Sequence, residues 1–144
     1  MPKFALLVRA TAFSESGKLP PDASTLLTKM TEYNTLLLDS GVLLSGDGLS
    51  ASSRGARVYF SSTAAPTVKK GPFDVDTLVS GYWMIKAKDL DEAVEWARKI
   101  PFATDDGIVE VRPVTGPEDF GEHMTDELKA KAEELRVRLE KQGE

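Results

Sequence analysis

The chain has 144 residues, of which 41% are hydrophobic and 28% charged, as is typical of one globular domain. It contains no cysteine, which excludes disulfides and thiolate metal sites. The net charge of −5 argues against sequence-independent binding to nucleic acid. The apolar run at residues 4–8 is too short for a signal-peptide core or a membrane span. We therefore expect a cytoplasmic protein with neither nucleic acid nor membrane as a partner.

The first part of the chain predicts a strand, a helix and two further strands. Apolar side chains at residues 3–9 alternate with period two, which is typical of a strand. A helix is expected over residues 22–40, and Gly41 suits its left-handed C-terminal cap. The helix has apolar positions three or four residues apart: Leu26, Met30, Tyr33 and Leu37. A strand from Val42 should then pair as a hairpin with a strand at residues 57–60.

The second part repeats this plan. Residues 81–87 are rich in strand-forming side chains, and Asp89 is expected to cap a helix that Pro101 ends. Residues 108–114 form the last predicted strand. Apart from the hairpin strand at residues 57–60, the order is β-α-β-β-α-β, which predicts an α+β fold of the ferredoxin-like type, in which two helices cover one face of an antiparallel sheet.

The residues after this unit predict a separate extension. We expect a domain over residues 1–116 and a C-terminal helical extension over residues 117–144, with Thr125 capping the helix. The helix has a narrow apolar stripe on a charged surface, formed by Leu128, Ala132, Leu135 and Leu139. Such a helix either packs loosely on the domain or contacts a partner.

Several predicted strands are apolar on both faces. In the first strand Phe4 and Leu6 point to one side while Leu7 points to the other, and Trp83 and Met84 alternate in the same way. Two helices cover only one face of a sheet, so the second face needs another cover. We expect that cover to be a second copy of the sheet, in a homodimer that encloses a pocket. The C-terminal helix is the alternative cover.

A series of segments resembles the YCII-related proteins, in particular the branch named for an Asp-Gly-Pro-Phe motif. The segments follow in order at residues 41–49, 52–58, 71–73, 81–85, 93–97 and 109–114. The resemblance extends over about residues 3–120 and implies a dimeric α+β barrel. It adds little about the substrate, because the biochemical role of the family is largely undefined.

The sequence departs from the family pattern at several positions. Lys70 stands where the naming motif has its Asp, and the family more often has Glu where this chain has Asp47. The resemblance also implies a His-Asp pair in YCII proteins proper. The only histidine here, His123, lies in the tail, so a histidine mechanism does not transfer.

Asp47, Glu110 and Arg112 are the candidate catalytic residues. If Val109 and Val111 pack under the helices, Glu110 and Arg112 point to the opposite face, where they are suited to bind a substrate carboxylate or orient a water. Asp47 lies between two glycines and is either a general base or a turn aspartate that bonds nearby backbone N–H groups. The alternative for Glu110 and Arg112 is a structural ion pair.

The candidate ligand-binding residues are polar or aromatic side chains on predicted strands and turns. Ser52 and Arg57 suit an anion cradle, and Trp83 suits a pocket wall or the core. The full set is Arg9, Ser52, Arg57, Lys70, Phe73, Asp74 and Trp83. Phosphate-loop, dinucleotide and His-rich metal motifs are absent, so we expect no cofactor and no metal.

Three functions fit these features. The first is a cofactor-independent acid–base enzyme of the isomerase, dehydratase or lactone hydrolase type, with its pocket at the dimer barrel. The second is a non-catalytic ligand-binding dimer. The third is a regulatory or structural dimer without a ligand, whose cavity is filled by Trp83, Met84 and their neighbours.

Overall fold

The computed structural model describes residues 1–143, which form two compact units that divide after Pro113. The elements of the first unit are β1 (Lys3–Arg9), α1 (Ala12–Glu15), α2 (Ala23–Asp39), β2 (Leu43–Gly48), a 3-10 turn (Ser52–Arg54), β3 (Ala56–Tyr59), β4 (Thr67–Lys70), a second 3-10 turn (Val75–Thr77), β5 (Val79–Lys86), α3 (Leu90–Arg98) and β6 (Val109–Pro113). The second unit contains a 3-10 segment (Pro117–His123) and α4 (Asp126–Gln142).

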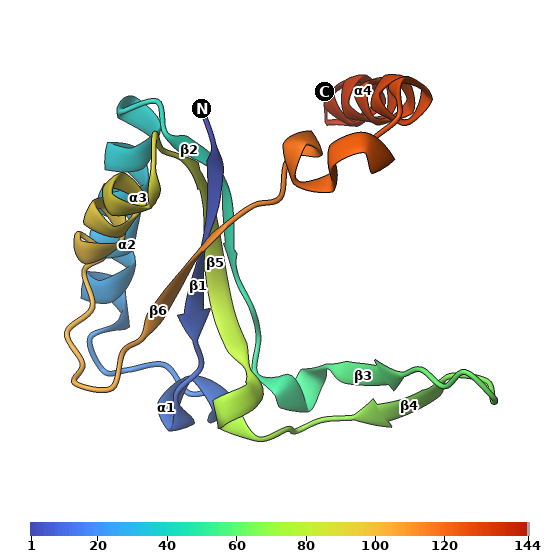
Figure 1. The fold of residues 1–144 in the computed structure, drawn as a ribbon. Coiled ribbons are helices and arrows are strands. Elements are labelled where there is room, and N and C mark those ends of the chain that lie inside the picture. Colours follow the sequence, from blue (N-terminus) through green and yellow to red (C-terminus); the bar gives the residue numbers. More distant parts are fainter. Residues whose placement is uncertain (144) are drawn as a thin grey trace. The chain divides into compact units, whose positions relative to one another are not determined.

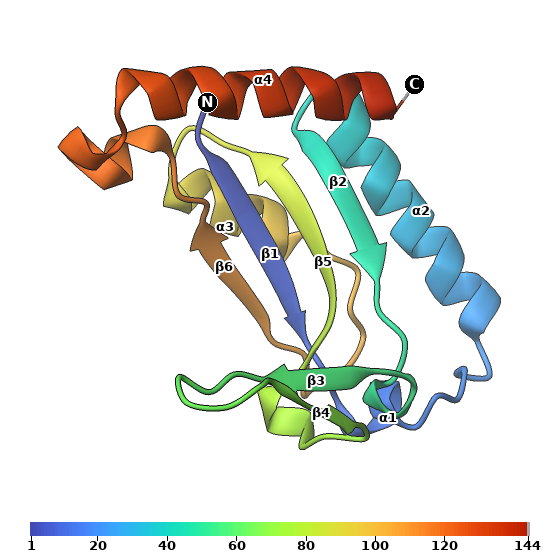
Figure 2. The ribbon, with the colours of Figure 1, turned by 90° about the vertical axis from the view of Figure 1, so that its right-hand side faces the viewer.

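Four strands form an antiparallel sheet in the order β2-β5-β1-β6. Helices α2 and α3 lie on the same side of this sheet (Figure 1). Without the β3–β4 hairpin, the chain order is β-α-β-β-α-β, and the predicted α+β fold is confirmed. Figure 2 looks onto the face that α2 and α3 leave uncovered, which we call the open face.

Local signals fix the ends of both helices. The α2 helix ends in a Schellman motif, in which the N–H groups of Gly41 and Val42 donate to the carbonyls of Leu38 and Leu37. Gly41 has a φ of 74°, which a glycine adopts without strain. At the start of α3, the Asp89 side chain accepts a hydrogen bond from the Glu92 N–H, as predicted.

The core lies between these helices and the sheet. Leu6 of β1, Leu37 of α2 and Ile85 of β5 are fully buried there. Tyr33 is also buried, and its hydroxyl donates a 2.8 Å hydrogen bond to the Trp96 carbonyl. Burial raises the pKa of Tyr33 to about 12, so this tyrosine stays neutral at physiological pH.

Strand register divides the side chains of the sheet between its two faces. Phe4 and Leu6 pair with Ile85 and Trp83, and Leu6 also pairs with Val111, so these side chains share the helix-covered face. Their sequence neighbours therefore point to the open face. Those neighbours include Ala5, Leu7, Tyr82, Met84, Glu110 and Arg112. The predicted alternation of apolar side chains on both faces is present.

The predicted pairing of residues 57–60 with the strand before them is wrong. Strand β3 pairs instead with β4 in a separate two-stranded sheet, with Val58 opposite Val68. Strand β2 pairs with β5 instead, because β5 is longer than β3 and has one buried face. The hairpin, residues 56–70, projects from the sheet on the side of the open face (Figure 1). We call it the arm.

The second unit is dominated by the charged helix α4. The Thr125 side chain caps it by accepting a hydrogen bond from the Leu128 N–H. Leu135 and Leu139 are exposed along the helix. Arg136 forms ion pairs with Glu133 and Glu140. Within residues 1–143, no helix combines the length and the apolar character needed to cross a membrane.

Candidate functional site

Asp47 and Tyr82 form a hydrogen-bonded pair on the open face. Asp47 lies in β2 directly opposite Tyr82 in β5, so their side chains emerge side by side. The Tyr82 hydroxyl donates to Asp47 Oδ2 at 3.1 Å. This hydrogen bond and the negative charge of Asp47 raise the pKa of Tyr82 above its ordinary value. The pair therefore combines a carboxylate with a phenol that stays protonated.

Gly46 and Gly48, the neighbours of Asp47, do not form the expected tight turn. Both lie within strand β2 and point to the helix-covered face. A Cβ added at Gly46 would lie 2.9 Å from Trp83 Cδ1, whereas one added at Gly48 would meet nothing within 4 Å. The absence of a side chain at Gly46 thus leaves room for the Trp83 ring on the helix-covered face. Asp47 is held in place by the pairing of β2 with β5.

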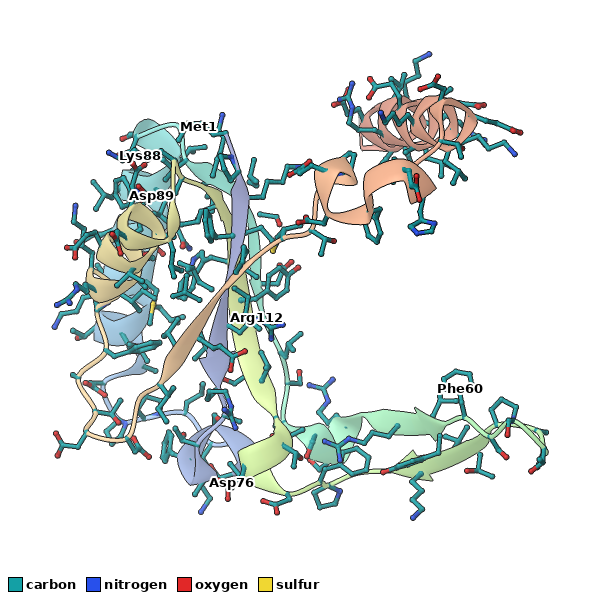
Figure 3. The ribbon with its side chains drawn as sticks, in the orientation of Figure 1. Met1, Phe60, Asp76, Lys88, Asp89 and Arg112 are labelled. Carbon is teal, nitrogen blue, oxygen red and sulfur yellow. The ribbon has the colours of Figure 1, made fainter. Side chains whose placement is uncertain are left out.

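Glu110 and Arg112 lie at the opposite edge of the same face. Arg112 Nη1 is 3.1 Å from Glu110 Oε2, and the Arg112 side chain is 65% exposed. Figure 3 shows Arg112 on the side of the sheet away from the helices. A guanidinium with this exposure keeps donors free for a planar anionic group such as a carboxylate.

These polar groups flank an apolar centre. Asp47, Tyr82, Leu7 and Glu110 form one row across the four strands, and Ser45, Met84, Ala5 and Arg112 form the next. Neighbouring strands lie about 4.8 Å apart, so Asp47 and Glu110 are about 14 Å apart on one face. The register therefore brings all three predicted catalytic residues to the same face but separates Asp47 from the other two.

A hollow of about 480 Å³ lies on the other side of β2, between the sheet and α2. Its walls include Met30 and Asn34 of α2, Gly48 of β2 and the indole of Trp83. Trp83 Nε1 donates a 2.7 Å hydrogen bond to Asn34 Oδ1. The edge at Asp47 and Tyr82 also borders the hollow. Trp83 is thus a pocket-wall residue, as well as a neighbour of the core.

Ser52 links three segments at the base of the arm. Its hydroxyl donates to the Glu15 carboxylate and accepts a 2.9 Å hydrogen bond from the Phe73 N–H. The Ser52 N–H also donates to Glu15, at 2.9 Å. Gly71 packs against this junction so closely that an added Cβ would lie 1.9 Å from the Ser52 carbonyl oxygen. The Ser52 hydroxyl is therefore engaged within the protein.

The other predicted ligand-binding residues lie around the same base. Arg57 stacks over the Phe73 ring at 4.2 Å and donates to Thr77 Oγ1 at 2.8 Å. Arg9 donates to the carbonyl oxygen of Asp76, and Figure 3 marks Asp76 at this lower end of the sheet. The Asp74 side chain caps the turn by accepting from the Asp76 N–H. Lys70 ends β4 and is exposed.

Sequence reasoning missed two partners in these clusters. Tyr82 is not among the candidate residues of the sequence analysis, because only the register of β2 against β5 brings its hydroxyl to Asp47. Glu15 carried no signal at all, because it lies 37 residues before Ser52. Among the residues that the structure describes, no three acidic or histidine side chains gather as a metal site would require.

We expect Asp47→Asn to lower the pKa of Tyr82. The substitution removes the negative charge that opposes formation of the phenolate, while the amide oxygen still accepts the hydrogen bond. An NMR titration with ¹³C-labelled tyrosine measures this, and Tyr82→Phe assigns the signal. Asp39→Asn, at the end of α2, is the control and should leave the titration unchanged. Equal Tyr82 pKa values in the wild type and Asp47→Asn would contradict the coupling.

Comparison with known proteins identifies the family. The YCII-related domain family matches residues 3–118, which include the whole sheet, both covering helices and the arm. No curated protein matches the sequence. His123 lies outside the matched range, in the second unit. Assignment to the Asp-Gly-Pro-Phe branch stays a prediction. The match over most of the chain, together with the fold, shows that this protein belongs to the YCII-related family.

Proposed function

We propose that this protein is a homodimer that binds a small anionic molecule between its two open faces, where Asp47 and Tyr82 carry out acid–base chemistry without a cofactor. One observation carries the proposal: Asp47–Tyr82 and Glu110–Arg112 share a sheet face whose centre is apolar. A second copy is the cover that suits this face, because the face has both acidic and basic groups and can therefore complement itself.

The two polar ends of the face have different tasks. Arg112 binds a carboxylate of the ligand, while Leu7 and Met84 contact its apolar part. The Asp47 carboxylate accepts a proton from a carbon acid or from water, and the Tyr82 hydroxyl turns from Asp47 to donate its one hydrogen bond to the oxygen on which charge develops. Such chemistry is that of an isomerase, dehydratase or lactone hydrolase, acting in the cytoplasm.

A non-catalytic ligand-binding or regulatory dimer is the second candidate. The hydrogen bond from Tyr82 to Asp47 favours it, because it engages one of the two carboxylate oxygens of Asp47 and the only proton that Tyr82 can donate. Asp47→Asn separates the two functions: an enzyme loses turnover by about a hundredfold or more. A binding protein keeps its ligand affinity within about twofold, because the binding groups at Arg112 are unchanged.

The fluorescent aromatic sulfonate 1-anilinonaphthalene-8-sulfonate is a probe for this site, because it combines apolar rings with one negative charge. We expect saturable binding that Arg112→Gln weakens about tenfold, the loss of one charge-assisted contact. The measurement is a fluorescence titration of the wild-type dimer and the variant. Unchanged affinity in Arg112→Gln, or no saturable binding, would refute the proposed site.

Arg98→Gln is a matched control for Arg112→Gln. Arg98 forms an ion pair with Glu95 at 3.1 Å, the same distance as in the Arg112–Glu110 pair, but it lies on the outer surface of α3. Arg98→Gln should therefore leave the affinity for the probe unchanged.

Gly48→Leu tests whether the probe binds in the hollow behind β2 instead, because the added side chain fills that hollow. If Gly48→Leu abolishes binding and Arg112→Gln does not, the probe occupies the hollow and the open-face site is wrong.

A further inference from the structure

We infer that the arm, residues 56–70, packs against the second copy and closes one end of the chamber between the two open faces. The inference rests on the proposed dimer and adds the contact surface that completes its site. In Figure 1 the arm leaves the sheet on the side without helices, and in Figure 2 it passes in front of the lower ends of β1 and β5. A copy stacked on the open face therefore meets the arm.

The arm is long enough for this contact. An extended strand advances about 3.3 Å per residue, so residues 56–62 reach about 20 Å. Two sheets that pack face to face lie about 10 Å apart. Even at a slant, the arm passes the sheet of the second copy and reaches the layer behind it. A hairpin that served only as a connection between β2 and β5 would not need this length.

One side of the arm is apolar and uncovered. Val58 and Val68 are directly opposed and are 52% and 64% exposed, and Phe60 is 82% exposed. Figure 3 shows Phe60 on the upper side of the arm, which is turned toward the space in front of the open face. Isolated two-stranded hairpins are marginally stable in water, so an arm with such a surface gains stability from a partner.

The side chains on the other side of the arm contact one another or the base of the arm. Lys69 lies over the Tyr59 ring at 5.2 Å, and Arg57 bonds Thr77 and stacks on Phe73. We therefore assign the side with Val58, Val68 and Phe60 to the contact with the second copy.

Charge also suits a second copy of this chain. The arm contains no acidic residue, and of its three basic residues Lys70 lies on the same side as Val58 and Val68. The whole chain has a net charge of −5, so the surface outside the arm holds the entire acidic excess. A basic, apolar arm therefore complements the body of another copy, and the two-fold symmetry of a dimer makes the contact twice.

The test compares two double variants by sedimentation equilibrium. Val58→Ser with Phe60→Ser removes the apolar surface and is expected to raise the dimer Kd at least about tenfold. Tyr59→Ser with Thr67→Ala changes the opposite side of the same strands and should leave the Kd within about twofold. A dimeric wild type whose Kd neither double variant changes would overturn the arm contact alone. A monomeric wild type would overturn the proposed dimer and the arm contact together.

Cross-linking identifies what the arm contacts. The chain has no cysteine, so Ser62→Cys gives one attachment point for a benzophenone label near the arm tip. In mixtures of ¹⁵N-labelled and unlabelled chains, the inference requires photoproducts that join the two kinds of chain. Products confined to one chain, for example between the arm and residues 126–142, would show that the arm covers its own C-terminal helix and would overturn the inference.

Discussion

Met84→Glu is expected to split the dimer into monomers that remain folded. Met84 lies at the centre of the open face, between Ala5 and Ser45 on the neighbouring strands. In the proposed dimer each copy would bury an unpaired carboxylate against an apolar surface, which costs several kcal/mol in total. We expect the Kd of the dimer to rise at least about 100-fold, as measured by sedimentation equilibrium.

Leu38→Glu is the control for this substitution. Leu38 is also an apolar side chain, 64% exposed on the outer surface of α2, and nothing in the proposed dimer covers it. The Kd should stay at the wild-type value. Circular dichroism should show the same helix content for both variants, because neither side chain belongs to the core between the helices and the sheet. If Leu38→Glu disrupts the dimer and Met84→Glu does not, the two copies meet through their helices and not through their open faces.

Features that depend on neighbours in sequence were predictable. The apolar stripe through Tyr33 and Leu37 places both buried residues of α2, and Gly41 and Asp89 mark helix ends where local hydrogen bonds are made. Strand parity is local as well, so the orientation of Glu110 and Arg112 follows from Val109 and Val111. Each signal depends on residues within about one helical turn or one strand.

Features that depend on which strands pair were not predictable in the same way. The Asp47–Tyr82 contact requires β2 and β5 to align in one register, although 35 residues separate the two side chains. Strand β4 has only four residues, all exposed, so it carries no period-two pattern, and β3 was consequently assigned the wrong partner. Register follows from the packing of the whole sheet, which no short window of sequence contains.

The same limit explains why the sequence did not predict which contacts the candidate ligand-binding residues make. Ser52 and Arg57 are predicted to suit an anion cradle, whereas the structure joins Ser52 to Glu15 and Phe73, and Arg57 to Phe73, at the base of the arm. This base is what holds the arm on the open-face side. The side chains predicted to bind a ligand therefore also connect the segments from which the arm emerges.

Gly71→Ala is expected to destabilise this base strongly. The added Cβ would lie 1.9 Å from the backbone oxygen of Ser52, so the backbone itself must move. The movement would break the Gly71 N–H bond to the Gly55 carbonyl, which closes the arm. We expect a loss of about 3 kcal/mol in the local free energy of opening, which amounts to about a 150-fold faster exchange of the arm amides. Hydrogen exchange by mass spectrometry measures it.

Gly55→Ala provides the matched comparison, because Gly55 is the other partner in that hydrogen bond. Its added Cβ would be 3.6 Å from the Ser52 oxygen, an ordinary contact, and its backbone is already extended. Exchange of the arm should change little. The sheet amides should be protected equally in both variants, because the core lies away from the arm base. If Gly71→Ala left the arm as protected as Gly55→Ala does, the close packing of Gly71 on Ser52 would not be what holds the arm in place.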